Sequence, residues 1–339
     1  MISALAWLYS AAVGLRRNLY DRGWIKTRRL PVPVISVGNL SAGGSGKSPV
    51  TAWIARRLKD RGHEPAVVSR GYRGRHPGPA TVVSAGDGPL VEARVGGDEP
   101  VMLARQLSGI PIIVSRNRLD GATMAVTRFG ARCVILDDAF QHRLLGRDLD
   151  LLLFDGADPV GNGRLLPAGC LREPIAAMAR ADAIVITRAD RAPAERIATL
   201  EALAREHCPR APIYHVRSHA SAIVGPDGEP IGAASSLRGQ RVVCFAGIAR
   251  PTVFFEDVAS LGARVVRTFS FPDHHRFSPA ERSVILDAAA AAGAERTLTT
   301  EKDLARLGGA FSPAVCALRL ATTVDREAEF TDMLERTLS

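Results

Sequence analysis

An apolar segment that leads into a glycine-rich turn is the feature that most constrains the fold of this chain. Residues 34–49 read VISVGNLSAGGSGKSP, a β-branched run followed by three glycines and then by Lys47 and Ser48. The strict phosphate-loop pattern begins with a glycine where this chain has Ser41, but the remainder of the pattern is present. Such a turn presents backbone N–H groups to phosphate at the start of a helix. The segment therefore predicts a strand, a phosphate-binding loop and a helix.

The loop also predicts which residues bind a nucleotide. They are Gly43, Gly44, Ser45, Gly46, Lys47 and Ser48. In this type of loop the lysine stabilises the transferred phosphate, and the hydroxyl after it binds Mg²⁺. Residues 186–190, ITRAD, resemble a degraded guanine-reading motif, but Arg188 replaces the lysine of that motif. We therefore expect a plain strand-to-helix turn at this position, and ATP with Mg²⁺ instead of GTP.

Short apolar segments alternate with helical stretches along most of the chain. Six such segments lie between residues 33 and 187, and four more lie between residues 241 and 320. This alternation is typical of a doubly wound, mainly parallel sheet. With 339 residues the chain is long for a single core, so two domains are expected. The predicted fold class is α/β, a P-loop NTPase-like sheet with a smaller C-terminal α/β domain.

Changes in composition suggest where these domains begin and end. Residues 31–217 are predicted to form the nucleotide-binding domain, and residues 241–339 the smaller domain. Between them, residues 218–240 are rich in Gly, Ser, Ala and Pro, and their GPDG sequence has turn chemistry. We expect a hairpin-like linker there. Residues 1–30 form a separate N-terminal segment.

The N-terminal segment combines an amphipathic pattern with basic charge. The first 15 residues are uncharged, and residues 16–29 contain six basic side chains against one acid, out of a net charge of +9. This pattern is typical of a helix that lies on an anionic membrane surface. The alternative is a helix packed on its own domain with solvated arginines. Nucleic acid is not expected as a partner, because aromatic residues make up only 5% of the chain and no nucleic-acid-binding motif is present.

Two acidic strand ends are candidates for holding the metal ion. The run CVILDDAFQH ends in Asp137 and Asp138, and Gln141 and His142 follow one turn later. Two adjacent carboxylates repel each other unless a cation lies beside them, and Mg²⁺ with ATP supplies one. The alternative candidate, Asp155, also suits a turn. We therefore favour Asp137 and Asp138.

Other polar clusters are candidates for the acceptor side of the reaction. The sequence GDEP places Asp98 and Glu99 at the start of a probable helix, where carboxylates also serve as plain caps. The sequence FPDHHRF contains His274 and His275 beside an aspartate. Phosphorylation of a hydroxyl group needs a base within reach of its proton. Arg172, Glu173 and residues 301–303 are further charged candidates, for which a solvated surface role remains open.

Eight sequence motifs are spread over essentially the whole chain, namely VGNLSAGGSGKSP, SRGYRG, GDEP, DDAFQHRLLGRDLDLLLFD, LLPAGCLREP, CFAGIARP, FPDHHRF and TTEKD. In their order and spacing the chain resembles the tetraacyldisaccharide 4′-kinases, the lipid A 4′-kinases of Gram-negative bacteria. The family's loop usually reads GGTGKTP, so this chain has two Thr-to-Ser changes that keep both hydroxyl groups.

The resemblance implies a reaction, a location and roles for several residues. The γ-phosphate of ATP would pass to the 4′-hydroxyl of a tetraacyl glucosamine disaccharide 1-phosphate at the cytoplasmic face of the inner membrane. The N-terminal helix would bind the membrane surface. Asp98 would act as the general base, with His274 of the smaller domain in support and Lys47 on the phosphates. The implied metal surroundings are Ser48, Glu99, Asp137 and Asp138, and the supporting residues are Gln141, His142, Arg172 and Glu173.

Two other functions are consistent with the phosphate loop. A regulatory or delivery NTPase of the switch type would bind a protein partner in a nucleotide-dependent way and would phosphorylate no lipid. A soluble kinase for a small metabolite would not need residues 1–20. The lipid kinase is the favoured hypothesis.

Overall fold

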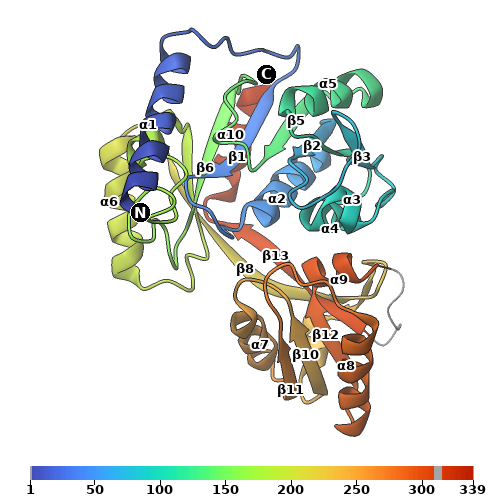
Figure 1. Ribbon diagram of the computed structural model, residues 1–339. Helices are drawn as coiled ribbons and strands as arrows, with labels where there is room; N and C mark the ends of the chain where they lie inside the picture. Colours follow the sequence, from blue (N-terminus) through green and yellow to red (C-terminus); the bar gives the residue numbers. More distant parts are fainter. Residues whose placement is uncertain (1, 309–314, 339) are drawn as a thin grey trace. The chain divides into compact units, whose positions relative to one another are not determined.

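The computed structural model describes residues 2–308 and 315–338, which form two compact units (Figure 1). The first unit comprises residues 1–70, 110–217 and 322–339, and the second comprises residues 71–109 and 218–321. This division differs from the expected domains at two segments. Residues 71–109 group with the second unit, and residues 322–339 group with the first.

The difference has a physical reason in the path of the chain. Strands β8 (Ile213–Val224) and β13 (Val315–Val324) each run through a boundary between the units, where composition gives no sign of a break. Residues 218–240, which we expected to be a hairpin-like linker, do form a hairpin of β8 and β9 (Pro230–Ala233). That hairpin is part of the second unit.

The first unit contains a parallel sheet in the order β8-β7-β6-β1-β5-β2-β4. Its other strands are β1 (Val34–Asn39), β2 (Pro65–Ser69), β4 (Ile112–Val114), β5 (Cys133–Asp137), β6 (Leu149–Asp155) and β7 (Ala183–Thr187). All residues of these six strands are buried, as expected for a parallel sheet covered on both faces. The predicted doubly wound α/β fold is confirmed.

In the part of the chain that the structure describes, six helices belong to this unit. They are α1 (Ile2–Asp21), α2 (Lys47–Asp60), α5 (Arg118–Phe129), the short 3₁₀ helix η1 (Ile175–Arg180), α6 (Ala194–His207) and α10 (Glu327–Leu338). Helix α2 packs against β1, β2 and β5. The last helix, α10, packs against α2, where the rings of Trp53 and Phe330 stack with their centroids 5.5 Å apart.

The second unit contains the parallel strands β11-β10-β12-β13, in this order. It contains β3 (Thr81–Ser84), α3 (Ala93–Gly96), α4 (Asp98–Gln106), the 3₁₀ helix η2 (Ala234–Leu237), β10 (Arg241–Ala246), α7 (Pro251–Ser260), β11 (Arg264–Ser270), α8 (Pro279–Ala291), β12 (Arg296–Thr300) and α9 (Glu301–Leu307).

Alternate residues of β10 enter two different cores. Val242 and Cys244 pack with Val258 of α7, and Val243 and Phe245 pack with side chains of α8. Because successive strand residues point to opposite faces, α7 and α8 cover opposite faces of this sheet (Figure 1). Helices α4 and α9 also pack against each other in this unit.

Candidate active site

The predicted phosphate loop connects β1 to α2. The chain turns through Gly46, which has a φ of 71°, and Lys47 is the first residue of α2. A Cβ atom at Gly46 would lie 3.2 Å from the Cβ of Thr187, so both the backbone conformation and the neighbouring strand favour glycine here. The first N–H groups of a helix lack partners within it, so the start of α2 is suited to an anion.

Lys47 is buried within the loop that it serves. Its Nζ atom lies 3.2 Å from Oδ1 of Asn39 and 3.4 Å from Oγ of Ser45. It also lies 3.5 Å from Oδ1 of Asp138, with which it forms an ion pair. With the carbonyl of Gly43, also 3.5 Å away, four oxygens hold the ammonium group at the start of α2.

The ends of β6 and β7 hold the backbone of the loop. The hydroxyl of Thr187 donates to the carbonyl of Ser45 at 3.0 Å. Arg188 pairs with Asp155, with its Nε atom 2.8 Å from Oδ1, and it also donates to the carbonyl of Gly44. The ITRAD turn is therefore more than a plain connection, since it fixes two carbonyls of the phosphate loop. Asp155, the alternative candidate for holding the metal ion, forms this ion pair with Arg188.

The two candidate metal-binding acids of the first unit have different surroundings. Asp137 ends β5 and is 1% exposed, and it accepts hydrogen bonds from the hydroxyls of Thr51 and Ser69, both at 3.2 Å. Asp138 adopts a φ of 53°, and its carboxylate meets Nη1 of Arg172 at 2.9 Å and 3.1 Å. Asp138 is therefore the acid that faces the cations of the site.

These cations decide the charge state of Asp138. Burial by itself raises the pKa of Asp138, but Lys47, Arg172 and Arg118 together bring this pKa below its ordinary value. Arg118 is 3% exposed and donates to the backbone carbonyl of Asp138 at 3.0 Å. Burial lowers the pKa of Arg118 to about 10, which leaves it charged at neutral pH. The site thus brings several positive charges close to one carboxylate.

The donor set around the loop suits Mg²⁺. The hydroxyl of Ser48 and the carboxylates of Asp137 and Asp138 are hard oxygen ligands, and Mg²⁺ bound with phosphates needs only one or two protein carboxylates. Across residues 2–308 and 315–338, no three His, Cys, Asp or Glu side chains are grouped as a protein-only metal site would require. Glu99, the fourth predicted metal residue, lies in the second unit, where its carboxylate is 3.2 Å from Nζ of Lys302.

Two of the predicted supporting residues contact the N-terminal helix. The side-chain amide of Gln141 donates to the backbone carbonyl of Asn39 at 2.9 Å. The backbone carbonyl of Gln141 accepts a hydrogen bond from Arg16 of α1 at 2.8 Å. The hydroxyl of Tyr9 donates to the carbonyl of Arg172 at 3.0 Å. Helix α1 is thus attached to the segments that carry Gln141 and Arg172.

The other two supporting residues are largely enclosed by protein. Glu173 is 4% exposed and pairs with Arg180 at 2.6 Å. Burial, followed by the nearby cations Arg118 and Arg147, lowers the pKa of His142 to about 4, so its imidazole is neutral at pH 7. These contacts support structural roles for both residues.

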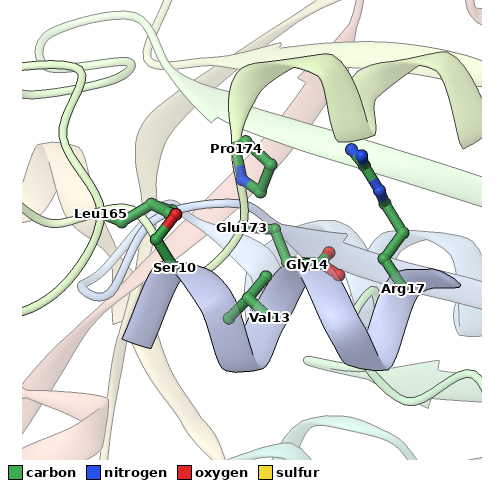
Figure 2. Close-up of a pocket in the computed structure, with 7 residues that line it drawn as sticks. All are labelled: Ser10, Val13, Gly14, Arg17, Leu165, Glu173 and Pro174. Atoms are coloured by element: carbon green, nitrogen blue, oxygen red, sulfur yellow. The ribbon is translucent and has the colours of Figure 1, made fainter. Parts of the chain in front are cut away.

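A small pocket lies between α1 and the segment around Glu173 (Figure 2). Its volume is about 140 Å³. It is lined by Ser10, Val13, Gly14, Arg17, Leu165, Glu173 and Pro174. Ligand pockets commonly measure about 300–1,000 Å³, so this pocket is too small for an acylated sugar.

The second unit brings together the predicted base and its predicted partner. Nδ1 of His274 lies 2.7 Å from Oδ2 of Asp98, and both side chains are mostly buried. We expected these residues to come from different domains, but both belong to the second unit. Asp98 is the first residue of α4 and follows Gly97, whose φ of 90° suits only glycine. A carboxylate at this end of a helix is stabilised by the helix dipole.

The neighbouring histidine has a different environment. The ring of His275 stacks on Phe271 with centroids 4.7 Å apart and meets the edge of Phe277. Its Nε2 atom lies 3.0 Å from Glu281, which also caps the start of α8. His275 therefore holds the loop together, and His274 is the histidine that contacts the predicted base.

Several residues of these two sites had no sequence signal that we recognised. Arg118 lies in no quoted motif, and Arg306, 3.4 Å from Asp98, also lies outside the quoted motifs. Asn39 and Asp303 lie within the motifs VGNLSAGGSGKSP and TTEKD, but neither motif indicates which residues they contact.

Known proteins match the chain over its full length. A sequence model of the family described as tetraacyldisaccharide-1-P 4′-kinase matches residues 1–339. The chain belongs to the tetraacyldisaccharide-1-P 4′-kinase family. The resemblance drawn from the motifs is thereby confirmed, as is the expected enzyme class, an ATP-dependent kinase.

Individual relatives agree with this assignment. A tetraacyldisaccharide 4′-kinase of Anaeromyxobacter dehalogenans (strain 2CP-C) is 43% identical over 332 residues, which cover 98% of this chain and 87% of that protein. One of Desulfatibacillum aliphaticivorans is 37% identical and covers 100% and 92% of the two chains. The crystal structure of LpxK from Aquifex aeolicus, in complex with ATP, matches the structure of this chain with a TM-score of 0.81 and 33% sequence identity. The match covers 100% of this chain and 98% of the Aquifex aeolicus chain.

Proposed function

We propose that this kinase transfers the γ-phosphate of ATP to the 4′-hydroxyl of a tetraacyl glucosamine disaccharide 1-phosphate, in lipid A biosynthesis. Family membership over residues 1–339 supports the acceptor, and the ATP complex of the Aquifex aeolicus relative supports the donor. The observation that carries the chemistry is the 2.7 Å hydrogen bond between His274 and Asp98, which prepares a carboxylate to act as a base.

The first unit binds the nucleotide. Backbone N–H groups of residues 43–48 surround the β- and γ-phosphates, and Lys47 turns from its present oxygen partners to the phosphate oxygens. The ammonium group of Lys47, which the loop already holds in place, then stabilises the negative charge that develops on the transferred phosphoryl group. Positioning and charge neutralisation supply most of the catalysis in phosphoryl transfer.

Ser48, Asp137 and Asp138 would hold Mg²⁺ together with the nucleotide. When bound, the ion would neutralise phosphate charge. Asp138 remains ionised because Lys47 and Arg172 lie beside it, and Asp137 is oriented by the hydroxyls of Thr51 and Ser69. Glu99 remains a prediction as a further acid near the metal.

Asp98 removes the proton of the acceptor hydroxyl. Its contacts with His274 and Arg306 both fall on Oδ2. No residue that the structure describes donates a hydrogen bond to Oδ1, so this oxygen is free to accept the proton. His274 donates through Nδ1 and fixes the carboxylate in one orientation.

The N-terminal helix places the enzyme on the cytoplasmic face of the bacterial inner membrane. Large apolar side chains of α1 point away from the protein, with exposed fractions of 54% for Leu5, 57% for Leu8 and 62% for Leu15. Trp24, just beyond the helix, is 72% exposed, and basic residues surround it. Such a surface suits the interface of an anionic bilayer, in which the lipid acceptor resides.

None of the helices within residues 2–308 and 315–338 combines the length and the apolar character needed to span a bilayer.

Vesicle binding tests the membrane proposal. The double variant Leu8→Asp with Leu15→Asp should lose co-sedimentation with phosphatidylglycerol-containing vesicles, because charge opposes insertion of the apolar face. The matched control is Leu90→Asp, which changes an equally exposed leucine (63%) of the second unit. Equal vesicle binding by the double variant and the wild type would contradict this location.

Product analysis tests the reaction itself. The purified enzyme is incubated with Mg²⁺ and γ-labelled ATP in mixed micelles that contain the tetraacyl disaccharide 1-phosphate, and the lipid is extracted and its labelled position determined. We expect label at the 4′-position. Steady hydrolysis of ATP or GTP with no labelled lipid would instead support a switch-type NTPase.

A further inference from the structure

Helix α9 carries the end of the TTEKD motif, to which the proposed reaction gives no role. Three of its polar side chains meet α4, the helix that begins with Asp98. Gln106 donates to Glu301 at 2.8 Å, Lys302 lies 3.2 Å from Glu99, and Arg306 lies 3.4 Å from Asp98. These contacts involve both ends of α4 and all belong to the second unit. The helix that presents Asp98 is therefore fixed by α9.

Arg306 is the most enclosed of these contacts. Its side chain is 4% exposed, and it forms an ion pair of 2.7 Å with Asp303, which is itself fully buried. Asp303 is fixed in turn by the hydroxyl of Thr300 at 2.7 Å and by the backbone N–H of Gly247 at 3.1 Å. The guanidinium group thus has a rigid support on the side away from Asp98.

Arg306 also binds the loop that presents His274. It donates to the carbonyl of His275 at 3.0 Å and to the carbonyl of Gly247 at 2.8 Å. The carbonyl of Gly247 also accepts the backbone N–H of His274 at 3.0 Å. The Arg306 side chain therefore contacts the Asp98 carboxylate and also two backbone carbonyls, those of His275 and Gly247, next to His274.

The chemistry of arginine suits this task. The guanidinium group is planar, always charged and able to donate in several fixed directions, whereas a lysine makes contact from a single ammonium group. Arg306 Nε and His274 Nδ1 both approach Oδ2 of Asp98, so the carboxylate is held through one oxygen. The other charged groups nearby are Asp273, 3.7 Å from Nε2 of His274, and the ion pair of Glu99 with Lys302.

We propose that Arg306 is a positioning residue that holds Asp98 and His274 in their reactive arrangement. This inference rests on the proposed function of Asp98 as the base. Arg306 itself touches neither ATP nor the acceptor in this account. Its loss should therefore lower kcat, while the KM for ATP, which depends on the phosphate loop, stays nearly constant.

Steady-state kinetics of two variants test the proposal. Arg306→Gln should lower kcat by about 10-fold or more with the KM for ATP within about twofold of the wild-type value, because the base loses its orientation. Arg306→Lys, which keeps the charge and part of the reach, should recover part of the loss. The matched control is Arg319→Gln, which breaks an ion pair with Glu301 of the same helix but has no contact with Asp98, and it should keep the wild-type kcat.

A double-mutant comparison separates positioning from general loss of structure. In the Asp98→Asn background, Arg306→Gln should lower kcat by less than about twofold, because the group that it positions is already gone. Full additivity of the two losses, or a wild-type kcat for Arg306→Gln, would overturn the proposal. If Arg306→Gln does not fold, as judged by circular dichroism and Tm, Arg306→Lys is used in the same comparison with the same criteria.

The result for Asp98→Asn alone distinguishes this inference from the function on which it rests. A wild-type kcat for Asp98→Asn would remove Asp98 as the base. A strong loss for Asp98→Asn with no loss for either Arg306 variant would leave the base in place and reject only the role of Arg306.

Discussion

His274 and Asp98 are 176 positions apart in the sequence, yet the imidazole Nδ1 and the carboxylate Oδ2 lie 2.7 Å from each other. The chain achieves this by grouping residues 71–109 with residues 218–321 in one compact unit. The predicted base and its predicted partner therefore belong to one unit, while the phosphate loop belongs to the other.

The two adjacent histidines offer a matched test of this relationship. His274→Ala should lower kcat by on the order of 10-fold or more, since Asp98 loses the donor that orients it. His275→Ala should instead lower the Tm, because its ring packs between Phe271 and Phe277. Kinetics and thermal unfolding of both variants are compared. A normal kcat for His274→Ala would remove His274 from the role assigned here.

Arg188 should control nucleotide affinity through the phosphate loop. Arg188→Ala removes the contacts with Asp155 and with the carbonyl of Gly44, so the loop loses part of its ordered conformation. We expect the KM for ATP to rise several-fold. Asp190→Ala, at the exposed end of the same turn, is the control and should change neither this KM nor the preference for ATP over GTP. A changed preference between ATP and GTP on loss of Asp190 would instead show that the turn reads the nucleotide base.

His142 should make stability depend on pH. Its pKa is lowered to about 4 in the folded chain by burial and nearby arginines, against an ordinary value of 6.5. Between about pH 6.5 and pH 4, His142 is therefore protonated in the unfolded chain and neutral in the folded chain. The contribution to the free energy of unfolding is present above pH 6.5 and is lost as the pH falls toward 4.

Urea unfolding of a His142→Gln variant between pH 4.5 and pH 7 measures this contribution. The variant should show a weaker dependence of its unfolding free energy on pH than the wild type. His219→Gln, at an exposed position, controls for the general effect of removing a histidine. An unchanged slope for His142→Gln would contradict the assigned environment.

Much of the fold follows from local pattern. Apolar runs predicted β2, β5 and β7 with the bounds that the structure shows, because a strand buried on both faces needs a mostly apolar segment. Strand β3 was not predicted. It has only four residues, and two of them are half-buried. An apolar segment this short does not distinguish a strand from a loop.

The candidate sites were predictable to a smaller extent. Lys47 and Ser48 follow from the loop pattern, which is local in the sequence. Asp98 and His274 were candidates from their own polar clusters, but only the family resemblance implied that they act together, because nothing in either short motif indicates that the other is its neighbour. Arg306 could not be predicted, since its importance lies in contacts with Asp303 and with distant carbonyls. Such long-range contacts are created by the fold.

The rate of phosphoryl transfer in a single turnover, with enzyme and bound ATP in excess over the lipid acceptor, tests the central claim most directly. Quenched-flow measurement follows label from γ-labelled ATP into the tetraacyl disaccharide for the wild type and for Asp98→Asn, while ATP binding is measured separately. We expect Asp98→Asn to bind ATP normally and to transfer the phosphate at least about 100-fold more slowly, as for a lost general base. Transfer at the wild-type rate by this variant would contradict the account.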